Sequence, residues 1–325
     1  MSALPASTDR GPEIAKRRVR IGDRVLNGLT TGSGIFVIAL VVAVGAYLLL
    51  TAIPSLRVNQ VSFLFSREWN VSDPEDLRFG IVDLMWTTVL SSAIAMLLAV
   101  PVAIGIALFI TNYAPPRLAA TLGYLVDLLA AVPSIIYGLW GIQVLAPAIK
   151  PFGTVLESAL GWFPLFQAGI SSPGTVYSAS VVLAIMILPI ITAISREVFA
   201  QTPLLHKEAA LALGATRWEM IRTTVIPFGR AGVISASMLG LGRALGETIA
   251  VTVILSKPAP GAPFNPSIFY GGETFASKIA NNASEFDTPT KTGAYIAAGL
   301  VLFLLTFAVN SVARSIINRR KEFTE

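Results

Sequence analysis

EAALALGATRWEMIRTTVIP, the stretch from Glu208 to Pro227, lies between two long apolar segments of this chain. A membrane protein that carries a polar loop of this kind on its cytosolic face usually presents it to a soluble partner. The flanking segments predict membrane-spanning helices, because each supplies about 20 residues with few charges. The stretch therefore indicates an all-α polytopic membrane protein whose energy source lies in another subunit.

Capping and stop signals divide the loop into two short helices. Thr202 followed by Pro203 favours a helix start, because the hydroxyl can cap the helix and proline needs no amide donor. Gly214 is expected to end that helix, since glycine accepts the left-handed conformation. Thr216 and Glu219 have the spacing of a capping box, which predicts that a second short helix begins there.

The surface of this helix pair is suited to docking. Ala209 and Ala210 keep the first helix thin enough to enter a groove, while Glu208 and Arg217 can pair with charges on a partner. Pro227 is expected to end the second helix. The alternative is an ordinary amphipathic loop packed against its own bundle. The order of cap, Glu-Ala-Ala, glycine, cap and proline favours docking.

Composition places the rest of the chain in a membrane. Of the 325 residues, 54% are hydrophobic and 13% are charged, against about 25% charged in a soluble domain. Cysteine is absent and His206 is the single histidine, which excludes thiol chemistry and multi-histidine metal clusters. We expect six membrane helices near residues 32–54, 85–111, 120–146, 176–196, 231–256 and 293–315.

The basic residues predict the orientation of these helices. Six spans place both termini and the 197–230 loop on one side, which carries sixteen of the 24 Lys and Arg residues. The other side carries Arg57, Arg67, Arg78, Lys150, Lys257, Lys278 and Lys291. Because basic loops stay inside, this bias assigns the termini and the 197–230 loop to the cytosol. Because the basic residues gather beside the ends of the apolar segments, the net charge of +5 does not indicate a protein that binds nucleic acid.

Three regions follow from this topology. Residues 1–30 form a basic cytosolic tail without the apolar core of a cleavable signal peptide. The part from Arg18 to Leu29 either forms a short interfacial helix or belongs to a disordered tail. Residues 31–318 form the six-helix domain, and residues 319–325 form a cytosolic C-terminal tail.

A charged pair interrupts the fifth predicted helix in the sequence GRALGE, residues 242–247. An arginine near the bilayer midplane costs about 2.5 to 3.5 kcal/mol on insertion scales, so Arg243 is expected to face protein or water and to mark a substrate route. Glu247 is expected one turn further along the same helix face. A structural ion pair is the alternative, and the two roles are compatible.

Small residues and prolines shape the predicted bundle. Two sets of small residues predict close approach of a neighbouring helix: Gly232, Ala236, Gly240 and Ala244 at every fourth position, and Gly242 with Gly246 as a GxxxG pair. Pro101, Pro133 and Pro189 fall inside predicted helices two, three and four and favour kinks. Asp127 is expected to cap a helix or to pair near the cytosolic part of helix three.

The loop resembles the coupling loop of ABC importer permeases. The match consists of Glu208, Ala209 and Ala210, then Gly214 four residues later, then Ile226 and Pro227. In that family the loop forms a coupling helix that enters a cleft of the ATPase subunit. The resemblance implies the same role here.

Two membrane stretches make the resemblance more specific. AAVPSIIYGLWGI (130–142) and GRALGETIAVTVIL (242–255) are similar to phosphate ABC transporter permeases of the PstC type. In the paralogous PstA type, GET is typically followed by Ala-Pro-Leu-Leu, which is missing here. The resemblance covers about residues 15–320 and implies the six-helix transmembrane domain of a type I ABC importer in the bacterial cytoplasmic (inner) membrane. It places Arg243 and Glu247 on the phosphate pathway, with Ser134 and Tyr137 as weaker candidates in the matching stretch.

The resemblance also implies partners. These are a second permease of the PstA type, a pair of ATPase subunits and an extracytoplasmic phosphate-binding protein that contacts loops 57–82 and 257–291. The chain contains no GxxxxGK[ST] loop, so we expect a transport subunit and not an enzyme. ATP and magnesium are expected on the ATPase, and no cofactor or metal is expected on this chain.

Other functions stay open at this stage. The cargo of an importer is phosphate or another oxyanion such as sulfate, molybdate or a phosphonate. Phosphate carries a P–OH proton at neutral pH and sulfate does not, so Glu247 would accept the first and repel the second. An ion-coupled secondary carrier is favoured by paired broken helices or an internal repeat, and the sequence shows neither by eye. A membrane enzyme needs a cluster of nucleophile, base or metal ligands, which Asp127 and Glu247 do not supply.

Overall fold

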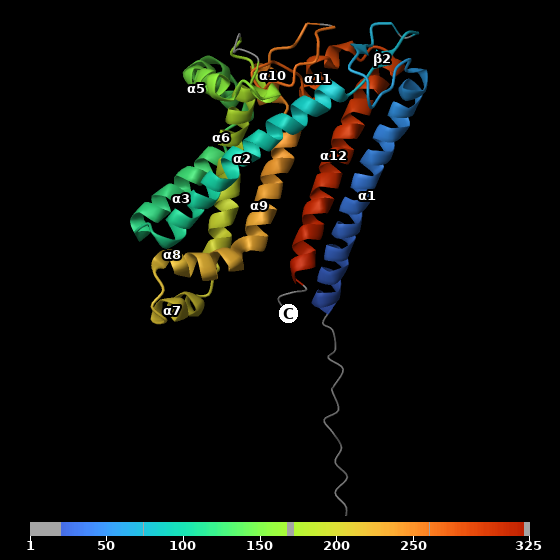
Figure 1. Ribbon diagram of the computed structural model, residues 1–325. Coiled ribbons are helices and arrows are strands. Elements are labelled where there is room, and N and C mark those ends of the chain that lie inside the picture. Colours follow the sequence, from blue (N-terminus) through green and yellow to red (C-terminus); the bar gives the residue numbers. More distant parts are fainter. Residues whose placement is uncertain (1–20, 74, 168–171, 260, 322–325) are drawn as a thin grey trace, which may run out of the picture. The chain divides into compact units, whose positions relative to one another are not determined.

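The computed structural model describes residues 21–73, 75–167, 172–259 and 261–321. The chain divides into two compact units, residues 1–47 and 48–325. In the first unit the described residues form the beginning of one long helix, α1 (Ile21–Val58). The second unit holds the end of α1 and all the other elements described below (Figure 1).

The second unit consists almost entirely of helices. Its longer helices are α2 (Val82–Asn112), α3 (Pro116–Ala130), α5 (Ala146–Leu160), α6 (Val176–Ala200), α9 (Ile226–Gly246) and α12 (Pro289–Lys321). Its shorter helices are α4 (Ser134–Trp140), α7 (Leu204–Ala212), α8 (Arg217–Met220), α10 (Ile249–Ile254) and α11 (Phe275–Asn281). Two π-helical turns, η1 (Gly141–Leu145) and η3 (Ile221–Val225), and two 3₁₀ turns, η2 (Pro164–Phe166) and η4 (Ala283–Glu285), connect them. Strands β1 (Trp69–Asn70) and β2 (Arg78–Phe79) pair antiparallel, with Trp69 opposite Phe79.

The membrane prediction is confirmed by helix length and composition. Among the described residues, six helical segments are long and apolar enough to cross a membrane: Arg24–Val58, Val82–Asn112, Ser134–Leu160, Val176–Ala200, Arg217–Gly246 and Pro289–Ser315. Residues 21–30, assigned above to the N-terminal tail, form the first turns of α1. The rest of that tail, residues 1–20, and residues 322–325 of the C-terminal tail lie outside the described residues.

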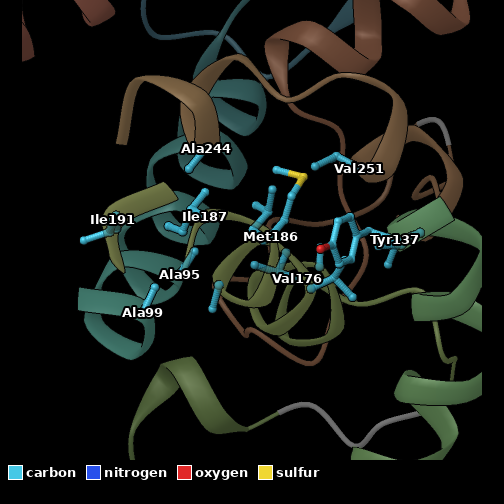
Figure 2. Packing of buried hydrophobic residues seen from close by; sticks show 14 of the residues in the cluster. Ala95, Ala99, Tyr137, Val176, Met186, Ile187, Ile191, Ala244 and Val251 are labelled. Atoms are coloured by element: carbon cyan, nitrogen blue, oxygen red, sulfur yellow. The ribbon is translucent and has the colours of Figure 1, made fainter. Parts of the chain in front are cut away.

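The core is built around α6, which packs against α2 and α9. Leu183, Ile187 and Ile191 of α6 are at most 1% exposed. Alanines at every fourth position of α2, including Ala95 and Ala99, face this row, as Figure 2 shows. Because alanine is small, the two helix backbones can approach closely and the branched side chains of α6 fill the space between them.

The predicted small-residue row on α9 is confirmed in this core. Ala236 and Ala244 are buried against α6. A Cβ atom added to Gly240 would lie 2.7 Å from Cδ1 of Ile191. The GxxxG pair makes no such contact within this chain: among the described residues, a Cβ atom on Gly242 or Gly246 would meet no atom within 4 Å. Gly242 is half-buried and Gly246 is exposed. That a neighbouring helix approaches this pair stays a prediction.

Substitution of Gly240 by valine is expected to destabilise the fold by about 1–3 kcal/mol, because the new side chain overpacks the contact with Ile191. The matched control is Gly242→Val, which places the same side chain in open space on the same helix. Thermal unfolding of both variants in detergent measures the difference. Equal melting temperatures for the two variants would contradict this account of the α6–α9 contact.

Two helices that were predicted to be continuous are broken. The third predicted helix, residues 120–146, ends with α3 at Ala130 and restarts as α4 at Ser134. Pro133 lies in the break, because proline lacks an amide hydrogen and restricts the residue before it. The fifth, residues 231–256, ends with α9 at Gly246 and restarts as α10 at Ile249. The short helices after the two breaks, α4 and α10, pack against each other.

Pro227 does not end its helix as predicted. Helix continues from Arg217 through η3 and α9 to Gly246, with a π turn that ends at Val225, two residues before the proline. The same relation recurs at η1, which ends at Leu145, two residues before Pro147. A π turn is wider than an α turn and changes the register of the backbone hydrogen bonds. The wider turn therefore lets the helix continue past a residue that cannot donate a hydrogen bond.

Candidate transport site and docking loop

Arg243 lines a cleft of about 880 Å³ on the α9–α12 side of the molecule, which we call the α9–α12 cleft. Its wall comes from α6, α9 and α12, and the described residues that line it include no carboxylate. The Nε atom of Arg243 is buried and has no hydrogen-bond partner among the described residues. A buried donor without a partner is costly, and a guanidinium group presents a planar fork of donors. The geometry is therefore suited to an anion with several oxygen atoms.

Glu247 lies at the break between α9 and α10. The expectation that it continues the helix one turn beyond Arg243 was wrong, because α9 ends at Gly246 and Glu247 has an extended backbone. Its side chain is folded into the protein and the residue is only 9% exposed. Its Oε1 atom accepts a hydrogen bond from the backbone amide of Ala250 at 3.2 Å. Glu247 thus satisfies one of the free amides at the start of α10.

Ser134 and Tyr137 lie at the other break. Ser134 is the first residue of α4. The Tyr137 ring is packed in the core near Met186 and Val251, and the residue is 8% exposed (Figure 2). Its hydroxyl donates a hydrogen bond to the carbonyl of Leu129, across the break, at 2.9 Å. Tyr137 therefore holds the end of α3 to the start of α4, and it also lies within electrostatic range of Arg243.

Replacing Tyr137 by phenylalanine is expected to reduce stability by about 1 kcal/mol, because it removes the hydrogen bond to Leu129 and keeps the ring. Unfolding in detergent measures this change. Tyr124→Phe is the control, because the Tyr124 side chain is 70% exposed. If both variants unfold like the unmodified chain, the hydroxyl of Tyr137 is not a structural link.

The docking loop, residues 204–220, has the predicted two-helix form. Helix α7 is followed by Gly214 with φ of +87°, which confirms the predicted glycine corner. The capping box at the start of α8 is also confirmed: the Thr216 amide donates to Glu219 Oε2 at 2.8 Å, and the Glu219 amide donates to Thr216 Oγ1 at 3.3 Å. The predicted cap by Thr202 was wrong. Its hydroxyl is buried without a partner among the described residues, and α7 begins after Pro203.

One side of the docking loop is packed and the other is exposed. Met220 is buried in a cluster with Phe199 of α6 and Leu108 of α2. In contrast, α7 contains no buried residue. The candidate coupling residues Glu208, Ala209, Gly214, Arg217 and Pro227 are exposed, and Ala210 is half-buried.

Large apolar side chains are also exposed on this loop. Leu205 is 74% exposed, Leu213 90% and Trp218 55%. The loop lies at one end of the second unit, opposite the end that carries α10, α11 and the strand pair (Figure 1). An exposed apolar group at the tip of a helix pair is typical of a surface that a partner covers.

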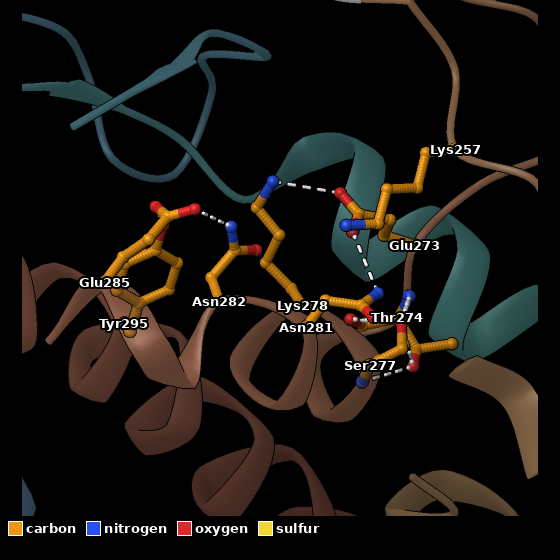
Figure 3. A network of polar contacts seen from close by, with 9 residues as sticks. All are labelled: Lys257, Glu273, Thr274, Ser277, Lys278, Asn281, Asn282, Glu285 and Tyr295. Atoms are coloured by element: carbon orange, nitrogen blue, oxygen red, sulfur yellow. Dashed lines mark hydrogen bonds and ion pairs between the residues drawn. The ribbon is translucent and has the colours of Figure 1, made fainter. Parts of the chain in front are cut away.

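Ion pairs join segments that are far apart in the sequence. Asp127 of α3 pairs with Arg196 of α6 at 3.2 Å, which confirms the expected pairing of Asp127. At the opposite end of the unit, Glu273 lies 2.9 Å from Lys278 and 3.6 Å from Lys257 (Figure 3). From the sequence, these two lysines contribute only to the charge bias that predicts the orientation. Their network was missed because nothing in the local sequence marks charges on separate loops as partners.

Known proteins match nearly the whole chain. Phosphate transport system permease protein PstC 2 of Mycobacterium tuberculosis is 55% identical over 306 residues, which cover 93% of this chain and 94% of that protein. This chain belongs to the PstC family of phosphate transport permeases. The PstC protein of Xylella fastidiosa is 39% identical over 97% of this chain and 96% of its own length. The family model for binding-protein-dependent transport system inner membrane components matches residues 99–322.

Solved structures show that this PstC-family chain has the fold of ABC importer membrane subunits. The MetNI methionine ABC transporter matches with a TM-score of 0.55 and 15% identity, covering 74% of this chain and 95% of that chain. A bacterial ABC transporter involved in the import of alginate matches with a TM-score of 0.54 and 14% identity, covering 91% and 99%. The expectation of an ABC importer transmembrane domain is confirmed.

Proposed function

We propose that this PstC-family permease carries inorganic phosphate through the α9–α12 cleft, with Arg243 as the residue that binds the oxyanion. The observation that carries the proposal is the partnerless, buried Nε of Arg243 in a cleft without carboxylates among its described lining residues. A guanidinium group can donate two parallel hydrogen bonds to a phosphate, which is a strong and directional arrangement. Ser134 and Tyr137 stay in the proposal as weaker candidate pathway residues, and Tyr137 also joins α3 to α4 through its hydrogen bond to Leu129.

Glu247 is proposed to give selectivity between oxyanions. One of its oxygens caps α10. Glu247 is not among the described residues that line the α9–α12 cleft, so the proposal places its other oxygen at the Arg243 end of the pathway, where it accepts the P–OH proton of phosphate. Glu247→Gln separates these tasks, because an amide oxygen can still cap α10 while the negative charge is lost. We expect the ratio of phosphate uptake to sulfate uptake to fall. An unchanged ratio in a variant that still transports would contradict this role.

The docking loop is proposed to attach the ATPase subunits. The loop exposes Glu208, Ala209 and Arg217 as well as leucines, so a partner that covers it meets both charge and apolar surface. ATP and magnesium would bind to the ATPase pair and not to this chain. The proposal includes a second permease of the PstA type and an extracytoplasmic phosphate-binding protein. It also places both termini and the docking loop on the cytosolic side of the bacterial inner membrane.

An ion-coupled carrier was disfavoured because the sequence shows no paired broken helices. The structure contains two broken helices, so their expected absence no longer speaks against a carrier. Family membership now decides between the two classes. Reconstitution in liposomes tests the whole proposal. The complete transporter should show ATP hydrolysis and uptake that respond to phosphate and not to sulfate or molybdate, and uptake should stop when the ATPase is omitted. Phosphate uptake driven by an ion gradient without ATPase would overturn it.

A further inference from the structure

We infer that Arg314 and Asn310 of α12 form a second oxyanion-binding point in the α9–α12 cleft, so that phosphate passes from Arg243 to Arg314 on its way through this subunit. Both residues line the same cleft as Arg243. The inference rests on the proposed function, because it names further residues of the same pathway.

The charge balance of two cavities supports this assignment. A cavity of about 1330 Å³ at the opposite end of the unit is also lined by basic side chains. Those are Arg67, Arg78, Lys257 and Lys278, and each is paired with one or more of the carboxylates of Asp83, Glu68, Asp76 and Glu273. The α9–α12 cleft has two arginines and, among its described lining residues, no acid. In the first cavity the positive charges are thus balanced by protein carboxylates. In the α9–α12 cleft they are not, so that cleft favours a bound anion.

Two cations that face one cleft repel each other, and here Arg243 is half-buried while Arg314 is exposed to solvent. A phosphate with one or two negative charges in the cleft reduces that repulsion and can accept hydrogen bonds from the guanidinium group that it has reached. Asn310 lies one helical turn before Arg314 and offers amide donors on the same side of α12. The forked cation of Arg314 and the amide of Asn310 together are suited to a tetrahedral oxyanion.

The positions of the two arginines along their helices suggest successive points rather than one. Arg243 lies in the last turn of α9, beside the break at Glu247. Ser235, which also lines the cleft, lies eight residues earlier, or about 12 Å at the rise of an α-helix. The cleft therefore extends along α9 from Arg243 toward the docking-loop end. Arg314 is near the end of α12 and provides the second cation.

The simpler reading is that Arg314 is one of the basic residues that fix orientation at the membrane surface. Uptake assays on the complete transporter separate the two roles. Arg314→Gln is expected to lower the maximal rate of phosphate uptake at least tenfold, and Arg314→Lys to retain a third or more of that rate. The control is Arg117→Gln, which removes a basic residue assigned to the same side at the start of α3 and should stay within twofold. An Arg314→Gln rate within twofold of the unmodified transporter would overturn the inference.

A second experiment leaves both arginines in place. The chain has no cysteine, so Ser235→Cys introduces one thiol into the wall of the cleft. We expect this thiol to react at least fivefold faster with a sulfonate-bearing methanethiosulfonate than with the trimethylammonium reagent, relative to Thr121→Cys on the exposed side of α3. Inorganic phosphate should slow the reaction, and adding Arg314→Gln should remove most of the preference. A preference that Arg314→Gln does not change would contradict the inference even if that variant transports poorly.

The outcomes also separate this inference from the proposed function. If the unmodified transporter carries no phosphate, the proposed function fails. If Arg243→Gln stops uptake while Arg314→Gln does not, only the second binding point is lost. Should Arg314→Gln fail to assemble with its partners, Asn310→Ala in the same uptake assay decides, with a loss of threefold or more expected.

Discussion

Arg243→Gln is expected to reduce phosphate uptake by the complete transporter at least a hundredfold. The substitution removes the charge and the forked donors from a cleft where, among the described residues, no other group partners the buried Nε. A hydrogen bond to a charged group contributes about 1.5–3 kcal/mol, so the loss of two such bonds costs about 3 kcal/mol or more. Arg243→Lys should give an intermediate rate, because lysine keeps the charge but not the planar fork.

Radiolabelled phosphate uptake into liposomes measures this effect. ATP hydrolysis without phosphate should change less than twofold, since Arg243 lies apart from the docking loop. Gly246→Ala is the control for local disturbance, because its Cβ atom would enter open space three residues from Arg243 and Gly246 is not among the described residues that line the cleft. Uptake by Arg243→Gln at more than a tenth of the normal rate would show that the oxyanion does not depend on this side chain.

The second large effect concerns the attachment of the ATPase. The double substitution of Leu205 and Leu213 by aspartate is expected to weaken binding of the ATPase subunits at least a hundredfold. Burying one leucine side chain contributes about 1.5–3 kcal/mol, so two of them account for about 3 kcal/mol or more. The chain itself should still fold, because both side chains are exposed in the structure.

Co-purification of the ATPase with the tagged permease measures attachment. Phe65→Asp is the control, since Phe65 is 82% exposed but belongs to the loop that precedes β1. That variant should retain normal ATPase binding. Undiminished co-purification of the double variant would mean that the exposed leucines of the docking loop are not the attachment surface.

Local features of this fold could be predicted from sequence because neighbours in the chain decide them. The left-handed Gly214 and the capping box of Thr216 and Glu219 each depend on a few consecutive residues. The six apolar segments follow from hydropathy alone. Arg243 was recognised because a charge inside an apolar segment requires protein or water around it.

The remaining features depend on packing between distant segments. The break at Glu247 requires a carboxylate that caps α10 and an α10 that packs on α4, and no local signal specifies either. Likewise, Gly240 and Gly242 belong to equally plausible small-residue patterns, but among the described residues a Cβ atom on Gly240 would meet Ile191 of α6, whereas one on Gly242 would meet no atom within 4 Å. Arg314 was counted as a topological charge because its cleft is formed by three helices that are far apart in sequence.

The uninterrupted helical segment from Arg217 to Gly246 has a mechanical consequence. It carries the end of the docking loop at one extremity and Arg243 at the other, with about 39 Å of helix between the two arginines. A tilt imposed by nucleotide-driven closure at the Arg217 end would displace the guanidinium of Arg243 directly, without any intervening relay. Insertions or flexible residues at η3 should then leave the ATPase bound and hydrolysing ATP while phosphate transport is lost.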